Sequence, residues 1–276
     1  MATSIHSNAA FRLADELRDQ AAVAPTKVER TKLTLLSSAA TLLDDRPFAQ
    51  VRPSDLAEHA QMSRAVIYHR FADLPALVAE LMTAFEHRVT LDLSHMAPRR
   101  KKFDYETLVH YLAWTLNTFM RNRGIMRLLL SHADQVPGVD VVVERTLLAF
   151  NQVLGDAAKA PKGLKWSPRS RLVVGYMIGG GVSDVLRRML QPGNDQLDAP
   201  RSAAEMFELV ELMAVVRHRE MHGADPSAAE IRSVAKAFDL SAFQRSLTDV
   251  RPAGLPAAPQ RQAMQRLRRM AAKATG

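Results

Sequence analysis

The stretch HAQMSRAVIYHRF, residues 59–71, decides which fold the sequence predicts. Ser63 is a suitable N-cap for a short helix over Arg64–Arg70, and Ser54 is a suitable N-cap for a preceding short helix over Asp55–Ala60. A turn of about three residues between two such helices is typical of a helix-turn-helix, whose second helix enters the major groove of DNA. The stretch therefore predicts a DNA-binding unit.

The predicted second helix has two different faces. Ile67 and Phe71 are four residues apart, so we expect them to face inward together with Met62. The remaining positions are then left for base edges and phosphates. The N-terminus of this helix adds a partial positive charge that favours a phosphate backbone.

Further helices are predicted on both sides of this unit. Residues 1–25 are expected to form an arm with a short helix, and Thr26 is a suitable cap for a longer helix after it. Apolar residues recur in that longer helix at helical spacing, namely Leu33, Leu36, Ala40 and Leu43. Downstream, Asp73 is a suitable cap for the next helix, and Pro75 is tolerated in its first turn.

Residues 32–82 as a whole resemble the DNA-binding domain of the TetR family of transcriptional regulators, with the resemblance extending over roughly 27–90. It is carried by Leu56, Ala57, Ala60, Met62, Ser63, Ile67, Tyr68, Phe71 and Leu77. The sequence departs from the family pattern at Gln61 and Ala65, where glycine is usual. It also departs at Leu74, which replaces a lysine that typically contacts a phosphate.

Because of Leu74 and Pro53, we expect the DNA contacts to be made by arginine and serine side chains around the two short helices. The predicted DNA-binding residues are Arg52, Ser54, Ser63, Arg64, Ala65, Val66, Tyr68, His69 and Arg70. The alternative interpretation of the same pattern is a helical bundle that matches the family pattern by chance.

Composition agrees with a helical protein and limits its chemistry. The chain has 276 residues, and it contains no cysteine, which excludes disulfides and thiolate metal sites. The net charge is +8, but residues 241–276 hold seven Lys or Arg against a single acid, so a basic composition alone does not predict DNA binding. The first 20 residues lack a signal-peptide core, and no apolar run nears the length of a membrane span, so a cytoplasmic protein is expected.

From residue 104 the pattern changes to long helices. The resemblance implies that residues 103–223 form an effector-binding and dimerisation domain. Large apolar side chains with a nearby amide can line such a pocket, although these residue types more often form plain core. The candidate effector residues are Trp114, Asn117, Phe119, Met126, Phe150 and Tyr176, with His132 and Met177 as further candidates.

The glycine triplet at 179–181 needs an explanation, because each glycine in a helix costs about 1 kcal/mol relative to alanine. Close approach of another helix, within the chain or between subunits, would offset that cost. The resemblance implies that the last two helices of the domain pair with their counterparts in a dimer. The candidate interface residues are Gly179, Gly180, Gly181, Met206, Leu209 and Met213.

The alternative is a strand, a phosphate loop and a helix over 170–190. The segment contains neither a G-x-G-x-x-G motif nor the Gly-Lys-Ser/Thr of a P-loop, and it is not a nucleophile elbow. His218 and His222 share a helical face without an acid at zinc-protease spacing, so no metal site is predicted there and a surface pair is expected. The sequence shows no constellation of catalytic residues.

We therefore expect an all-α protein with an N-terminal three-helix helix-turn-helix domain at 26–90 and a larger helical domain at 103–223. A C-terminal extension with a basic tail follows at 224–276, and Asp225 is a possible cap for a helix in it. The predicted function is a DNA-binding transcriptional repressor that binds a pseudo-palindromic operator as a homodimer. We expect a small-molecule effector to release the repressor from this operator. No cofactor, metal or membrane association is predicted. The alternatives are a phosphate-ligand protein or enzyme built on 170–190, and an architectural DNA binder without an effector.

Overall fold

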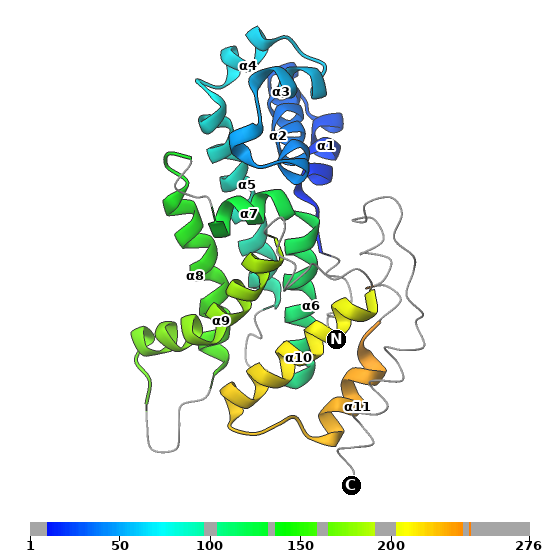
Figure 1. Ribbon diagram of the computed structural model, residues 1–276, viewed down its shortest axis with the longest axis vertical. Helices are drawn as coiled ribbons and strands as arrows, with labels where there is room; N and C mark the ends of the chain where they lie inside the picture. The colour runs from blue at the N-terminus through cyan, green and yellow to red at the C-terminus, as the bar shows by residue number, and fades with distance from the viewer. Residues whose placement is uncertain are drawn as a thin grey trace.

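The computed structural model describes residues 10–96, 104–131, 136–158, 165–190, 203–239 and 243. Within these ranges every regular element is a helix, which confirms the predicted all-α class (Figure 1). The helices are α1 (Leu13–Val23), α2 (Lys27–Asp45), η2 (Phe48–Gln50), α3 (Pro53–His59), α4 (Arg64–Arg70), α5 (Leu74–Met96), α6 (Tyr105–Arg121), α7 (Arg123–Ser131), α8 (Asp140–Ala157), α9 (Pro168–Met189), α10 (Ala203–His222) and α11 (Ala228–Ala237).

Helices α1 to α4 gather at one end of the molecule and form the head, and α5 runs from the head into the second domain (Figure 1). Thr26 caps α2 as predicted, because its hydroxyl accepts a hydrogen bond from the Glu29 amide at 3.1 Å. The helix expected in the N-terminal arm is present as α1. It packs along α2 and buries Leu13 and Leu17, so it belongs to the head rather than extending from it.

The start of α3 differs from the predicted one. Ser54 lies inside the helix, and Arg52 takes the N-cap position, one residue before Pro53. Proline suits the first helical position because its φ is already helical and its missing N–H has no partner to lose there. The carboxylate of Asp55 then accepts the Arg52 amide at 3.0 Å and satisfies a free donor of the first turn.

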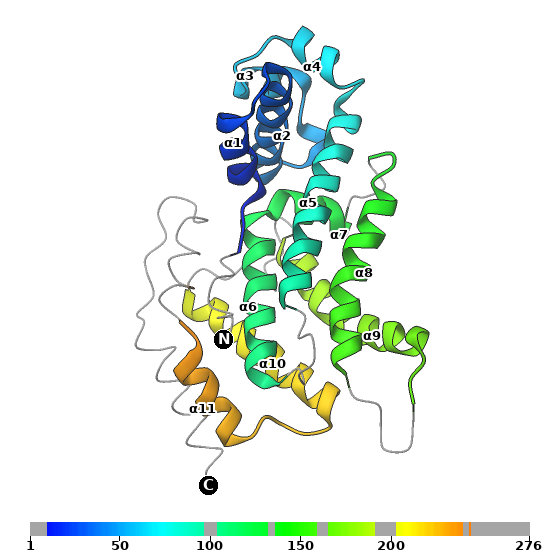
Figure 2. The same ribbon diagram turned by 180° about the vertical axis from the view of Figure 1, so that it is seen from behind.

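The second domain is built around α6, whose residues 111–119 are all buried. Helices α7, α10 and α11 contact α6, while α8 packs between α5 and α9 (Figure 2). The predicted cap of the helix after Gly223 was Asp225, but Ser227 is the cap, in a box with Glu230. Asp225 instead binds Arg219 at 2.7 Å. No helix in the described ranges has the length and apolar character needed to cross a bilayer.

Helices α8 and α9 cross at glycines, which allows their backbones to touch. A Cβ on Gly155 would overlap the carbonyl of Arg171, and a Cβ on Gly175 would overlap the carbonyl of Asn151. At Gly179 a Cβ would collide with the side-chain oxygen of Asn151. The close approach expected for the glycine segment is therefore realised within the chain at Gly179.

Candidate functional site

Helix α4 presents a polar outer face and buries a single large side chain. Ile67 is 1% exposed, and Phe71 is buried directly after the helix, as their spacing predicted. Tyr68 is 53% exposed, and Arg64 lies exposed at the first position of the helix. The other predicted contact residues on and before α4 are exposed at Ser63, Ala65 and His69 and half-buried at Val66 and Arg70.

Ser63 holds the N-cap position of α4, but its side chain makes no capping hydrogen bond. The Ser63 hydroxyl and the first amides of α4 are therefore available to donate hydrogen bonds to a ligand. They lie at the end of the helix that carries a partial positive charge. Arg70 at the other end has its Nε buried without a hydrogen-bond partner among the described residues. Arg52 is exposed and Ser54 is half-buried at the start of α3.

The turn between α3 and α4 bends through Gln61, whose φ of 53° lies in the left-handed region. It is the single residue other than glycine with positive φ in the described ranges. The Met62 amide closes the turn by donating to the Ala57 carbonyl at 2.9 Å. A side chain here is strained, because a Cβ crowds the backbone in this conformation and glycine avoids the contact.

Five of the six effector candidates are buried in the second domain. Trp114 and Phe119 pack on Phe150, with ring centroids 5.9 Å and 5.7 Å apart. Asn117 and Met126 are also buried. Tyr176, in contrast, is 43% exposed on α9, and Met177 is exposed as well, while His132 lies outside the described residues. We refer to Trp114, Phe119 and Phe150 as the aromatic cluster.

Several polar groups lie at the aromatic cluster. The Trp114 indole N–H donates to Asp92 at 3.2 Å, and the Tyr111 hydroxyl donates to the Phe150 carbonyl at 3.2 Å. Burial raises the pKa of Tyr111 above its ordinary value, so this hydroxyl remains a donor at all physiological pH values. The Thr118 hydroxyl is fully buried, with no hydrogen-bond partner among the described residues.

The predicted interface residues divide between the interior and the surface. Gly179, Met206 and Met213 are buried within the chain, and Leu209 is half-buried. Gly180 is exposed and a Cβ there would meet nothing within 4 Å, whereas the guanidinium of Arg217 lies against Gly181.

Further exposed apolar side chains on the same two helices were not predicted from the sequence to be interface residues. Val173 and Met177, 52% and 73% exposed, share a face of α9 with Tyr176 and Gly180. Leu212 and Val216 are exposed on α10. The signal was the spacing of 173, 176, 177 and 180, which places these residues on one side of a helix. We refer to Val173, Tyr176, Met177, Gly180, Leu212 and Val216 as the α9–α10 face.

The interpretation of 170–190 as strand, loop and helix is wrong. Helix α9 is continuous from Pro168 to Met189 and includes the triplet. Positive φ among the described glycines occurs only at Gly138 and Gly223. The helical backbone engages its own amides, so the triplet offers no loop of free N–H groups to a phosphate.

The histidine pair is not the surface pair that the sequence indicated. His218 is 5% exposed, and its Nδ1 lies 2.9 Å from the Ala224 carbonyl. The ring of His222 is 4.5 Å from that of His218, centroid to centroid. In the part of the chain that the structure describes, no three side chains of His, Cys, Asp or Glu are arranged so that they could hold a metal ion.

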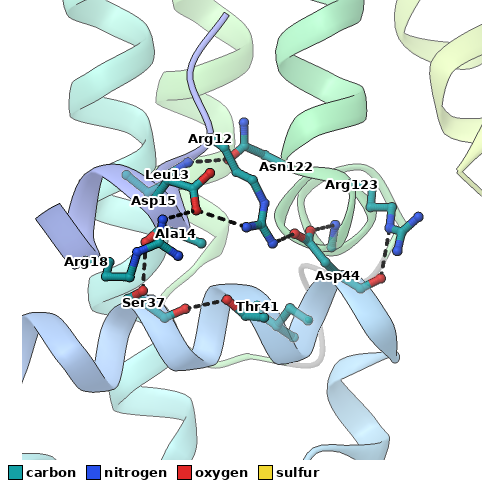
Figure 3. Close-up of polar contacts among 12 residues, drawn as sticks. Arg12, Leu13, Ala14, Asp15, Arg18, Ser37, Thr41, Asp44, Asn122 and Arg123 are labelled. Atoms are coloured by element: carbon teal, nitrogen blue, oxygen red, sulfur yellow. Dashed lines mark hydrogen bonds and ion pairs between the residues drawn. The ribbon is translucent and has the colours of Figure 1, made fainter. Parts of the chain in front are cut away.

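A buried polar junction joins the head to the second domain (Figure 3). The carboxylate of Asp44, at the end of α2, accepts from Arg12 and from the Gly124 amide, each at 3.0 Å. Asn122 accepts from the Leu13 amide at 2.8 Å. A Cβ on Gly124 would overlap the backbone of Leu43, so the start of α7 touches the end of α2 directly. The polar contacts of this junction were not predicted from the sequence.

Residues 35–81 match the family model for bacterial regulatory proteins of the tetR family. These residues run from within α2 into α5 and include the whole α3–turn–α4 unit. No curated protein sequence matches the chain.

Three solved structures share the fold. A tetR-family transcriptional regulator from Streptomyces coelicolor is 17% identical and has a TM-score of 0.53, over 90% of this chain and 100% of that one. A putative TetR-family regulator from Mesorhizobium loti is 14% identical with a TM-score of 0.53, over 70% and 97%. The regulator FadR from Bacillus subtilis, in complex with stearoyl-CoA, is 11% identical with a TM-score of 0.53, over 70% and 98%.

At these identities the structural likeness concerns the fold, and the sequence match concerns the head. The two findings agree with each other and with the exposed α4, since the matched residues form the helix-turn-helix at the expected place. Residues 35–81 therefore carry the DNA-binding unit of the tetR family of bacterial regulatory proteins, and the fold of the chain is similar to that of solved TetR-family regulators.

Proposed function

We propose that this DNA-binding regulator is a repressor that binds a specific operator as a homodimer and leaves it when a small molecule binds the second domain. The observation that carries the DNA-binding part is the outer face of α4, where Arg64, Tyr68 and His69 are exposed over a buried Ile67. Side chains at such positions reach base edges, and arginine prefers guanine. A repressor of this kind acts in the cytoplasm.

The aromatic cluster supports the effector part of the proposal. A largely apolar molecule can replace aromatic packing, and the buried hydroxyl of Thr118 offers it one hydrogen bond. Stearoyl-CoA, which Bacillus subtilis FadR binds, is one probe with a long apolar part. The probe set should also include aromatic molecules of the size of an indole, because the cluster itself is aromatic.

The α9–α10 face supports the homodimer. Met177 and Leu212 are 73% and 61% exposed, and large apolar side chains exposed together mark interaction surfaces. We propose a second copy of this chain as the partner of this face, because a dimer supplies two α4 helices, one for each of two successive major grooves. Gly180 lies on this face without a side chain, so another helix can approach it closely.

The proposal is tested by selecting bound sequences from random DNA with the purified full chain. We expect one enriched pseudo-palindrome with half-sites about one helical turn apart. Adding probe molecules to the complex with that operator then tests release. Selection without any enriched sequence would refute specific recognition, and an enriched site that contains a single half-site would refute the dimer. An operator bound more tightly in the presence of every active probe would refute the repressor mechanism.

A further inference from the structure

Trp114 connects the aromatic cluster to a buried acid on α5. Its indole N–H donates to Asp92 Oδ2 at 3.2 Å, and Asp92 is 7% exposed. The other carboxylate oxygen of Asp92 binds Arg88 one turn earlier on α5. A buried carboxylate needs such partners, because desolvation of an unpaired charge costs far more than a neutral hydrogen bond supplies.

Arg88 uses the rest of its guanidinium to hold α1. Its Nε donates to the two carboxylate oxygens of Glu16 at 3.1 Å and 3.0 Å. The guanidinium also lies over the ring of Phe11, 4.7 Å from its centroid. Arginine can bind two carboxylates at once because its donors form a planar fork, which the ammonium of lysine lacks.

Helix α1 is in turn fixed to α2 of the head. The Ser37 hydroxyl on α2 donates to the Ala14 carbonyl at 2.7 Å, and Arg12 binds Asp44 at the end of α2 at 3.0 Å (Figure 3). Both contacts involve charged or polar partners that are at least partly buried. Helix α1 precedes the residues that match the family model, so the family match does not account for these contacts.

We propose that Asp92, Arg88 and Glu16 are positioning residues that form a relay between Trp114 in the aromatic cluster and the DNA-binding head through α1. The inference rests on the proposed function, in which a small molecule enters at the aromatic cluster. A ligand that moves the indole removes one donor from buried Asp92. The carboxylate then draws Arg88 toward itself, and Glu16 on α1 loses its partner. Coupling between two sites of this kind changes affinity about 5- to 150-fold.

The first test uses the free full-length protein and hydrogen exchange of backbone amides. Trp114→Phe removes the N–H while retaining an aromatic ring, and we expect the amides of α1 to exchange about fivefold faster or more, with no matching change in α9. Phe119→Leu is the control, because it disturbs the same cluster at a ring that has no hydrogen-bond donor to offer Asp92. Unchanged exchange in α1, or an equal rise in α1 and α9, would overturn the relay.

A double-mutant cycle on the same readout separates a relay from two unrelated defects. Glu16→Gln removes the charge that Arg88 binds, and Asp19→Asn, on the exposed side of α1, removes a charge outside the relay. In a relay, Trp114→Phe adds little to Glu16→Gln, whereas it retains its full effect when combined with Asp19→Asn. Equal, additive effects in the two combinations would contradict the proposal.

The second test uses the operator obtained by selection and the emission of Trp114. The chain has two tryptophans, so Trp166→Phe leaves Trp114 as the single emitter. Because coupling is reciprocal, operator binding at the head must change the emission of Trp114, and Glu16→Gln must abolish most of that change. Operator binding without any change in emission would refute the relay. Failure to find an operator would refute the proposed function instead, and the exchange experiment would still decide on the relay.

Discussion

Replacing Gln61 by glycine should stabilise the protein, although it removes a side chain. The turn requires a φ of 53° at this position. A Cβ in the left-handed conformation costs roughly 1–2 kcal/mol. Glycine avoids this cost but loses more conformational freedom on folding, which is worth about 0.4–1 kcal/mol. The net gain is therefore about 0–1.6 kcal/mol in the free energy of unfolding, centred near about 0.8 kcal/mol.

Gln61→Ala is the matched control, because alanine also removes the amide but keeps the Cβ. Denaturant unfolding followed by the helical signal at 222 nm gives the free energy of unfolding for both variants. Differential scanning calorimetry should show a rise in Tm of about 1–4 °C for Gln61→Gly. Equal stability of the glycine and alanine variants would show that the strain at Gln61 is no larger than the cost of glycine's greater conformational freedom, and the predicted net gain would then fail.

Four further outcomes are expected. Arg64→Ala should lose roughly 1–3 kcal/mol of operator binding and change the base preference at one position, and an unchanged preference in repeated selection would exclude a base contact. Gly175→Ala should destabilise by about 1–3 kcal/mol because its Cβ meets the Asn151 carbonyl, and an unfolding curve unchanged from that of the wild type would contradict this. Gly180→Leu should give monomers with weak operator binding, and light scattering of an intact dimer would remove Gly180 from the interface. Truncation after Gly254 should leave the slope of log affinity against log salt unchanged, since a tail that contacts DNA would shift that slope by about 0.9 per phosphate.

Local features of the fold could be predicted because the residues that determine them are close in sequence. Thr26 and Asp73 cap α2 and α5 through amides three residues away, and Ile67 and Phe71 turn inward at helical spacing. Two predicted caps were wrong where several polar residues compete. Arg52 occupies the N-cap position of α3 in place of Ser54, because Pro53 starts the helix.

The head–domain junction could not be predicted, since its partners are far apart in sequence. The Leu13 amide and Asn122 are separated by 109 residues, and Arg88 and Glu16 by 72. Neither pair forms a periodic pattern or a motif. The residues of the aromatic cluster could be named from the sequence as effector candidates because of their residue types. Only the structure shows that Phe150 is the ring contacted by both Trp114 and Phe119.

The junction also makes the position of the head on the second domain depend on directed hydrogen bonds. Burial raises the pKa of Asp44 above its ordinary value, and hydrogen bonds from the Gly124 amide and Arg12 act against that rise. Arg12 precedes α1 of the head, whereas Gly124 belongs to α7 of the second domain. Asp44 is itself part of the head, so its carboxylate keeps the Gly124 amide only while the head sits in one place.

A head displaced by about one hydrogen-bond length would leave the buried Gly124 amide without its acceptor, at a cost of about 1–3 kcal/mol. An apolar contact of similar area would instead weaken gradually, because dispersion and burial carry no directional requirement. Polar partners at Asp44 therefore set a threshold for head movement. An effector that binds the displaced state more tightly by that amount suffices to move the head, whereas one that binds both states equally moves nothing.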